Sequence, residues 1–141
     1  MSRRISHVLD TSALLAHYFN EPGAGVVERL WSEDSSGLAI SAVTIAELKG
    51  RLIQEITDDT ESAKAADTYL NELTICLPVD RATAELAWQL RQASPHRLPL
   101  VDALIAATAR AAGAILVHKD PHMSQIPAGL VRQIALSDKV M

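Results

Sequence analysis

Short apolar runs alternate along the chain with longer segments in which apolar residues recur at helical spacing. Five runs have the length and aliphatic content of buried strands, at residues 5–9, 38–40, 75–77, 114–117 and 130–134. The segments between them predict helices, at residues 13–19, about 22–33, 42–56, 59–73, 81–93 and 100–112. Strands that alternate with helices in this way are typical of an α/β fold.

Polar residues and glycine mark where several of these helices begin or end. Thr11 or Ser12 can cap the first helix. Ser41 and Asp80 stand directly before two later helices and are predicted to cap them. Gly113 follows the last helix, where a glycine commonly ends one. That last helix is apolar nearly all round, which predicts burial on most of its sides.

Length and composition fit one globular domain over residues 1–141. At 141 residues and 48% hydrophobic content, the chain is long enough to bury a core but too short for a second domain. Aromatic residues make up only 4%, so we expect an aliphatic core and no aromatic platform for stacking bases. The single cysteine, Cys76, excludes an internal disulfide or multi-cysteine zinc site, and its apolar neighbours predict a buried side chain.

The charge balance limits how the chain could contact nucleic acid. A net charge of −4 argues against non-specific attachment, because phosphates attract basic surfaces. Any RNA contact must come from local basic residues, unless these are ordinary solubilising charges; the candidates are Arg3, Arg4, Lys49, Arg51, Arg97 and Lys119. Asp10 and His17 interrupt the first hydrophobic stretch, so it does not resemble a signal peptide, and we expect a cytoplasmic protein without membrane spans.

Four acidic residues stand where an α/β fold collects reactive groups. Asp10 ends the first predicted strand, and Asp120 lies just past the strand at 114–117. Glu47 is in the helix after the second strand, and Asp102 is the only acid of the last helix. Because such groups gather beyond the carboxyl ends of parallel strands, the four could converge and raise one another's pKa values. Clustered carboxylates suit Mg²⁺ or Mn²⁺, and such a site can activate water for in-line attack at phosphorus.

Each of these acids also has a purely local interpretation. Asp10 can be a turn or pre-helix cap residue, and Asp120 can be a turn residue before a proline. Glu47 lies three residues after Thr44, which is the spacing of a capping box. Asp102 can complement the dipole of its helix from the first turn.

Four segments carry a resemblance to a known family: DTSALLA at 10–16, SAVTIAEL at 41–48, LPVD at 77–80 and LVDALIAATA at 100–109. In this order and with these separations they resemble the PIN domain, particularly the VapC-like toxins. The resemblance covers nearly the whole chain. It implies one PIN-like domain with a short, mostly parallel sheet flanked by helices on both faces. It also implies metal-dependent ribonuclease activity, a homodimer, and inhibition by a VapB-like antitoxin whose tail blocks the site.

By motif position, the resemblance assigns the core metal-binding and catalytic acids to Asp10, Glu47 and Asp102, with Asp120 as a further acid. Thr11 or Ser12 would support the site through hydroxyl or backbone hydrogen bonds. The chain departs from the family at residues 117–123, which read VHKDPHM. Here His118 stands where the family usually has a threonine or serine, which weakens the assignment of Asp120 alone. His118 could bind a phosphate or a metal, or be a polar loop residue.

Together these features predict a Mg²⁺- or Mn²⁺-dependent endoribonuclease, the toxin of a type II toxin–antitoxin system, that hydrolyses RNA phosphodiester bonds with metal-activated water. The predicted contacts to the RNA backbone are Lys49, Arg97 and Lys119. One alternative is a PIN fold that binds RNA or protein without cutting, which the altered segment around His118 favours. A second is a phosphatase with Asp10 as nucleophile, although Ser12 stands where that class needs a second acid.

Overall fold

The computed structural model describes residues 4–137 of the chain. Five strands of the described chain form one parallel sheet: β1 (His7–Leu9), β2 (Leu38–Ser41), β3 (Ile75–Leu77), β4 (Ile115–His118) and β5 (Gln133–Ala135). Their order across the sheet is β3-β2-β1-β4-β5, so β1 is the central strand. The predicted α/β class and parallel sheet are therefore confirmed.

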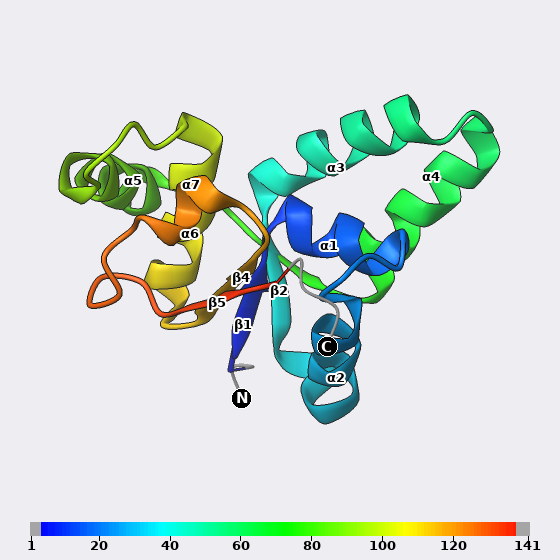
Figure 1. Ribbon diagram of the computed structural model, residues 1–141, viewed down its shortest axis with the longest axis horizontal. Coiled ribbons are helices and arrows are strands. Elements are labelled where there is room, and N and C mark those ends of the chain that lie inside the picture. Colours follow the sequence, from blue (N-terminus) through cyan, green and yellow to red (C-terminus); the bar gives the residue numbers. More distant parts are fainter. Residues whose placement is uncertain (1–3, 138–141) are drawn as a thin grey trace.

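Helices cover both faces of the sheet. The α-helices of the described residues are α1 (Thr11–Tyr18), α2 (Ala24–Asp34), α3 (Ala42–Glu55), α4 (Asp59–Asp67), α5 (Arg81–Ala93), α6 (Leu100–Ala112) and α7 (Pro121–Ser124). A 3-10 turn at Ser35–Gly37 precedes β2, and a π-helical turn at Thr68–Glu72 continues α4. Helices α1 to α4 lie on one side of the sheet and α5 to α7 on the other (Figure 1). None of the helices within residues 4–137 is long and apolar enough to cross a membrane.

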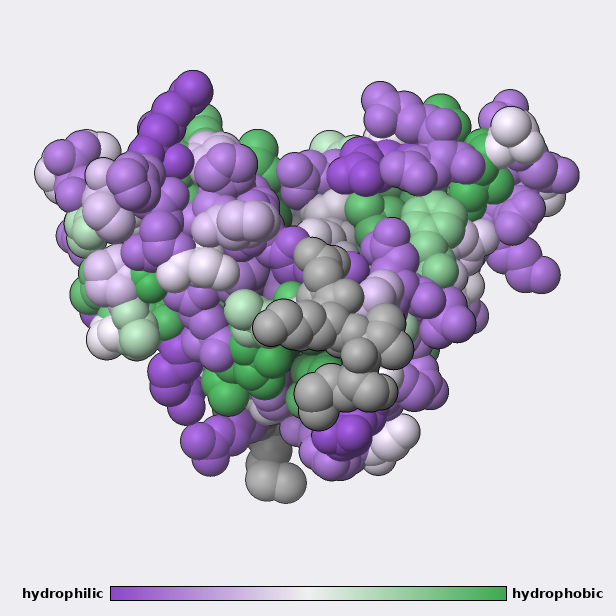
Figure 2. Space-filling view, viewed as in Figure 1, coloured by the Kyte–Doolittle hydropathy of each residue, from purple (hydrophilic) through white to green (hydrophobic). Residues whose placement is uncertain are grey.

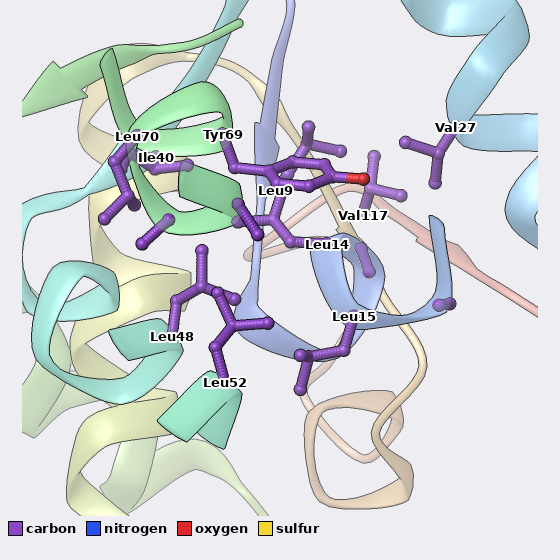
Figure 3. Packing of buried hydrophobic residues seen from close by; sticks show 14 of the residues in the cluster. Leu9, Leu14, Leu15, Val27, Ile40, Leu48, Leu52, Tyr69, Leu70 and Val117 are labelled. Carbon is purple, nitrogen blue, oxygen red and sulfur yellow. The ribbon is translucent and has the colours of Figure 1, made fainter. Parts of the chain in front are cut away.

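Alternation along the central strand divides the core into two clusters. Successive strand residues point to opposite faces. Leu9 faces α1 and α3, where Figure 3 shows it with Leu14, Leu48 and other residues of that cluster. Val8 faces the other way and joins the α5–α6 cluster, to which α6 contributes alanines such as Ala106. Both Val8 and Leu9 are fully buried, so each face of the sheet carries its own aliphatic core.

The strand order fixes where a site can form. The chain passes from β1 to β2 and β3 on one side, and later places β4 and β5 on the other side of β1. The order thus reverses between β1 and β4, and in open α/β sheets ligands bind beyond the carboxyl ends of the strands at such a switch point. The space-filling view shows a notch between the side of the molecule that carries α5 to α7 and the side that carries α3 (Figure 2).

Two of the predicted helix caps are wrong. Asp10, and not Thr11 or Ser12, caps α1: its side chain accepts a hydrogen bond from the backbone N–H of Ala13. Ser41 precedes α3 but makes no capping bond, because its buried Oγ is hydrogen-bonded to Thr108 Oγ1 of α6 at 3.0 Å. The predicted Asp80 cap of α5 and the glycine that ends α6 are confirmed.

The prediction for Cys76 is also wrong, because its side chain is exposed. It is the middle residue of β3, an edge strand, whose flanking residues Ile75 and Leu77 are half-buried while Cys76 points away from them. The last strand begins later than predicted, at Gln133, because the residues before it form a turn in which Leu130 N–H bonds to Pro127 O.

Candidate functional site

Asp10 is a buried carboxylate at the carboxyl end of the central strand. Only 3% of its surface is exposed, and its backbone N–H donates to Val117 O of β4 at 3.0 Å. Oδ1 accepts from Ala13 N at 2.9 Å, and Ser12 Oγ lies 2.7 and 2.8 Å from Oδ1 and Oδ2. Burial nevertheless raises its pKa to about 7, the hydrogen bonds oppose this, and the charges of Asp120 and Asp102 add to it.

Ser12 joins Asp10 to the segment that follows β4. While Ser12 Oγ donates to the Asp10 carboxylate, it also accepts from the backbone N–H of Lys119 at 2.8 Å. This bond spans two neighbouring strand ends, so it fixes the loop that carries Asp120 relative to Asp10.

Glu47 reaches the site from α3 and is held by Thr11. Thr11 Oγ1 donates to Glu47 Oε1 at 2.5 Å, which joins α3 to the first residue of α1. The capping-box interpretation of Glu47 is wrong, because the α3 N-terminus has no side-chain cap and the carboxylate is bound to Thr11 instead. The hydroxyls of Thr11 and Ser12 thus each contact one of the acids.

Asp102 and Asp120 lie close to each other, with His122 beside them. One ligand atom from each of these three side chains lies within 4.8 Å of the other two. Burial raises the pKa of Asp102 to about 7, and Asp120, by charge and by hydrogen bond, and then Glu47 contribute further, whereas His122 opposes the rise. Asp102 therefore interacts electrostatically with acids from both sides of the notch.

His118 is a buried part of the framework and not the polar loop residue that the sequence also allowed. It is the last residue of β4 and is fully buried. Its Nδ1 accepts from the Asp120 N–H at 3.1 Å and its Nε2 donates to Gln133 Oε1 at 2.8 Å, which fixes one neutral tautomer. Burial lowers the pKa of His118 and so favours this neutral form. His118 therefore holds the backbone of Asp120 in place.

The predicted RNA-contact residues are spread over the surface. Lys119 adjoins Asp120, and Arg97 lies in the exposed loop before α6, where its carbonyl accepts from Gln125 beside α7. Lys49 is elsewhere: with Ile53, Asp59 and other residues it lines a cavity of about 530 Å³ between α3 and α4. Arg4, at the opposite end of β1, lines a cavity of about 340 Å³, and Arg51 pairs with Glu55. Arg3 lies outside the described residues.

The donor set fits a hard divalent cation. Carboxylates of Asp10, Asp102, Asp120 and Glu47 act on one another electrostatically across the end of the sheet. Because burial raises the pKa values of Asp10 and Asp102 to about 7, these carboxyls keep their protons to a higher pH than exposed carboxyls do in the metal-free protein. Oxygen ligands of this kind suit Mg²⁺ or Mn²⁺, whose charge would stabilise the ionised carboxylates.

The fold and the site define an α/β protein with a carboxylate cluster at the switch point of its parallel sheet. A family model described as "PIN domain" matches residues 7–129, and the chain belongs to that family. No curated protein gives a significant match.

Several solved structures share the fold at low sequence identity. VapBC2 from Rickettsia felis, bound to a DNA fragment from its promoter, is 18% identical with a TM-score of 0.75, covering 94% of this chain and 100% of that one. VapBC-1 from nontypeable Haemophilus influenzae is 18% identical with a TM-score of 0.73, covering 93% and 98%. Mycobacterium tuberculosis VapC20, described as a toxin that cleaves the sarcin–ricin loop, is 23% identical with a TM-score of 0.68, covering 89% and 97%.

Proposed function

We propose that this protein is a metal-dependent endoribonuclease and the toxin of a toxin–antitoxin pair. The observation that carries the proposal is that Asp102 of α6 and Asp120 after β4 have carboxylate atoms within 4.8 Å of each other, close enough to hold one ion. Asp10 at the end of β1 and Glu47 of α3 are near enough for their charges to act on this pair. Membership of the PIN family and a fold shared with VapC20, a sarcin–ricin loop cleaving toxin, support it.

In this proposal Asp10, Asp102 and Asp120 hold Mg²⁺ or Mn²⁺, and Glu47 contributes directly or through water. The bound cation would neutralise charge on the scissile phosphate and lower the pKa of the attacking water. Ser12 holds the Asp10 carboxylate and the Lys119 backbone, and His118 holds the Asp120 backbone. Lys119 and Arg97 would contact the RNA backbone, whereas Lys49 lines a different cavity and is a weaker candidate.

We also propose a VapB-like antitoxin partner, a homodimer and a cytoplasmic site of action. The VapBC2 structure from Rickettsia felis contains a DNA fragment from the promoter, and the VapBC structure from Salmonella typhimurium also contains DNA.

Trp88 of α5 leaves 61% of its surface exposed, so it is a candidate for the homodimer contact. Light scattering should report a dimer for the wild type and a monomer for Trp88→Glu. A monomeric wild type would contradict the homodimer.

Two alternative functions compete with this proposal. The non-cleaving module was favoured by the altered residue His118, yet His118 still fixes Asp120 through its ring nitrogen. The phosphatase needs a second acid two residues after Asp10, and the residue there is Ser12, whose hydroxyl contacts the Asp10 carboxylate. A phosphoenzyme trapped at Asp10 would revive the phosphatase.

The decisive experiment is RNA cleavage with Mg²⁺, with Mn²⁺ and with chelator. Asp10→Asn and Asp102→Asn should abolish the metal-dependent cleavage, because each removes a charge from the cluster. Asp80→Asn is the matched control, since Asp80 caps α5 as Asp10 caps α1 but is exposed. Equal cleavage by the wild type and the two site variants would refute the proposal. Retained RNA binding without cleavage under any divalent ion would favour the binding module.

A further inference from the structure

His122 gives the acidic cluster a nitrogen donor. It is the second residue of α7, and its backbone N–H donates to Asp120 Oδ1 at 2.9 Å. Its ring Nδ1 lies 3.2 Å from the same oxygen, and 60% of its side chain is exposed. The bond at the start of α7 thus fixes the backbone of His122, while its ring faces the pair formed by Asp102 and Asp120.

The spacing of the three side chains is close to that of ligands of one ion. Ligands about 2.1 Å from an ion lie at most roughly 4.2 Å from one another. The ligand atoms of Asp102, Asp120 and His122 are already within 4.8 Å. The remaining difference is within reach of side-chain rotation, which is unhindered for an exposed ring such as that of His122.

The chemistry of the set differs from that of carboxylates alone. Mg²⁺ binds oxygen and keeps several waters, whereas imidazole is a ligand of first-row transition ions. Replacing one oxygen donor by an imidazole nitrogen therefore lowers the relative affinity for Mg²⁺. The other histidine near this cluster, His118, has both ring nitrogens in hydrogen bonds to Asp120 and Gln133, so His122 is the histidine available to an ion here.

We propose that His122 is a nitrogen ligand of the same metal site and makes the site prefer Mn²⁺ to Mg²⁺. The inference rests on the metal site of the proposed function, and it assigns the selectivity of that site to a residue outside the four acids. A carboxylate or amide at this position would remove the nitrogen donor and with it the preference.

The test measures metal binding rather than cleavage. Affinities of the full-length protein for Mn²⁺ and Mg²⁺ are measured by calorimetry, and nitrogen coupled to bound Mn²⁺ is detected by electron spin-echo spectroscopy. His122→Asn should lose the nitrogen coupling and lower the affinity for Mn²⁺ by about tenfold. Losing even a residue that only hydrogen-bonds to a metal ligand typically lowers metal affinity by about 10–100-fold, so tenfold is the lower end of the expected range. His122→Asp should also lose the coupling but keep Mg²⁺ affinity, so its preference for Mn²⁺ falls. His96→Asn, in the exposed loop before α6, is the control and should change neither.

The outcomes separate this inference from the proposed function. A wild type without nitrogen coupling, or coupling that persists in both His122 variants, would overturn the role of His122. So would an unchanged ratio of Mn²⁺ to Mg²⁺ affinity. No binding of either ion by the wild type would overturn the metal site itself. Nitrogen coupling that depends on His122, in a protein that cuts no RNA, would support this inference while refuting the nuclease.

Discussion

Asp10→Asn should stabilise the metal-free protein above neutral pH although it destroys the proposed site. The introduced asparagine can keep the capping role, because its side-chain oxygen can accept from Ala13 N–H as Asp10 Oδ1 does. Its amide nitrogen can donate to Ser12 Oγ, which lies 2.8 Å from Asp10 Oδ2 in the wild type. What the substitution removes is a buried negative charge next to two other carboxylates.

The size of the effect follows from the pKa of Asp10. In the folded protein burial raises this pKa from 3.8 to about 7, so the folded state keeps a proton that the unfolded chain has already released. Stability is therefore greatest below the unfolded pKa and falls by about 1.4 kcal/mol per pH unit until the pH reaches the folded pKa. Between about pH 5 and about pH 8, the wild type should lose roughly 2–3 kcal/mol relative to Asp10→Asn.

Urea unfolding in chelator at both pH values measures this difference. Asp80→Asn is again the matched control, because hydrogen bonds from Thr83 lower the pKa of Asp80, so its charge stabilises the folded state. Asp80→Asn should therefore be less stable than the wild type at about pH 8, which is the opposite sign. If Asp10→Asn is destabilised at high pH, or if its difference from the wild type does not change with pH, then Asp10 is not a strained buried charge.

Three further results are expected. Mn²⁺ at one fixed concentration, about a hundred times its Kd at about pH 8, should raise the free energy of unfolding by about 2.7 kcal/mol at that pH. The same concentration should raise it by less at about pH 5, because the ion competes with the protons on Asp10 and Asp102; equal shifts at both pH values in urea titrations would contradict this. His118→Leu should lower the free energy of unfolding by about 1–3 kcal/mol and weaken Mn²⁺ binding, because it removes the acceptor for Asp120 N–H and the donor to Gln133. Unchanged Mn²⁺ affinity by calorimetry would show that His118 does not support the metal site. Tyr69→Phe should cost about 1 kcal/mol, because the Tyr69 hydroxyl is 2.7 Å from His17 Nδ1, and leave RNA cleavage unchanged; a change in cleavage would extend the site to this side of the sheet.

The sequence predicted elements best where local and tertiary signals agree. β3, α5 and α6 have the predicted bounds, because Asp80 caps α5 and Gly113 adopts the left-handed conformation that ends α6. The parallel order of the sheet was expected from the family resemblance, and the structure has it. The exposure of Cys76 was not predictable from its apolar neighbours, because it depends on β3 being an edge strand, which only the sheet order reveals.

The capping residues of α1 and α3 were predicted wrongly for a different reason, which concerns the site itself. A serine or threonine before a helix is a good cap when its hydroxyl has no other hydrogen-bond partner. Ser12 donates to Asp10, Thr11 donates to Glu47, and Ser41 is bonded to Thr108 of α6. These three partners are distant in sequence or belong to the acidic cluster, so a local pattern could not assign them.

Asp10 shows why capping and metal binding were not true alternatives. Its Oδ1 caps α1 in the folded protein, and the same carboxylate is buried beside Asp102 and Asp120 strongly enough to raise its pKa. A residue that served only as a cap could stay exposed, as Asp80 does, where hydrogen bonds from Thr83 lower its pKa. The folded state therefore carries a cost at Asp10 that capping does not require, and a cation held by the cluster is the interaction that would offset it.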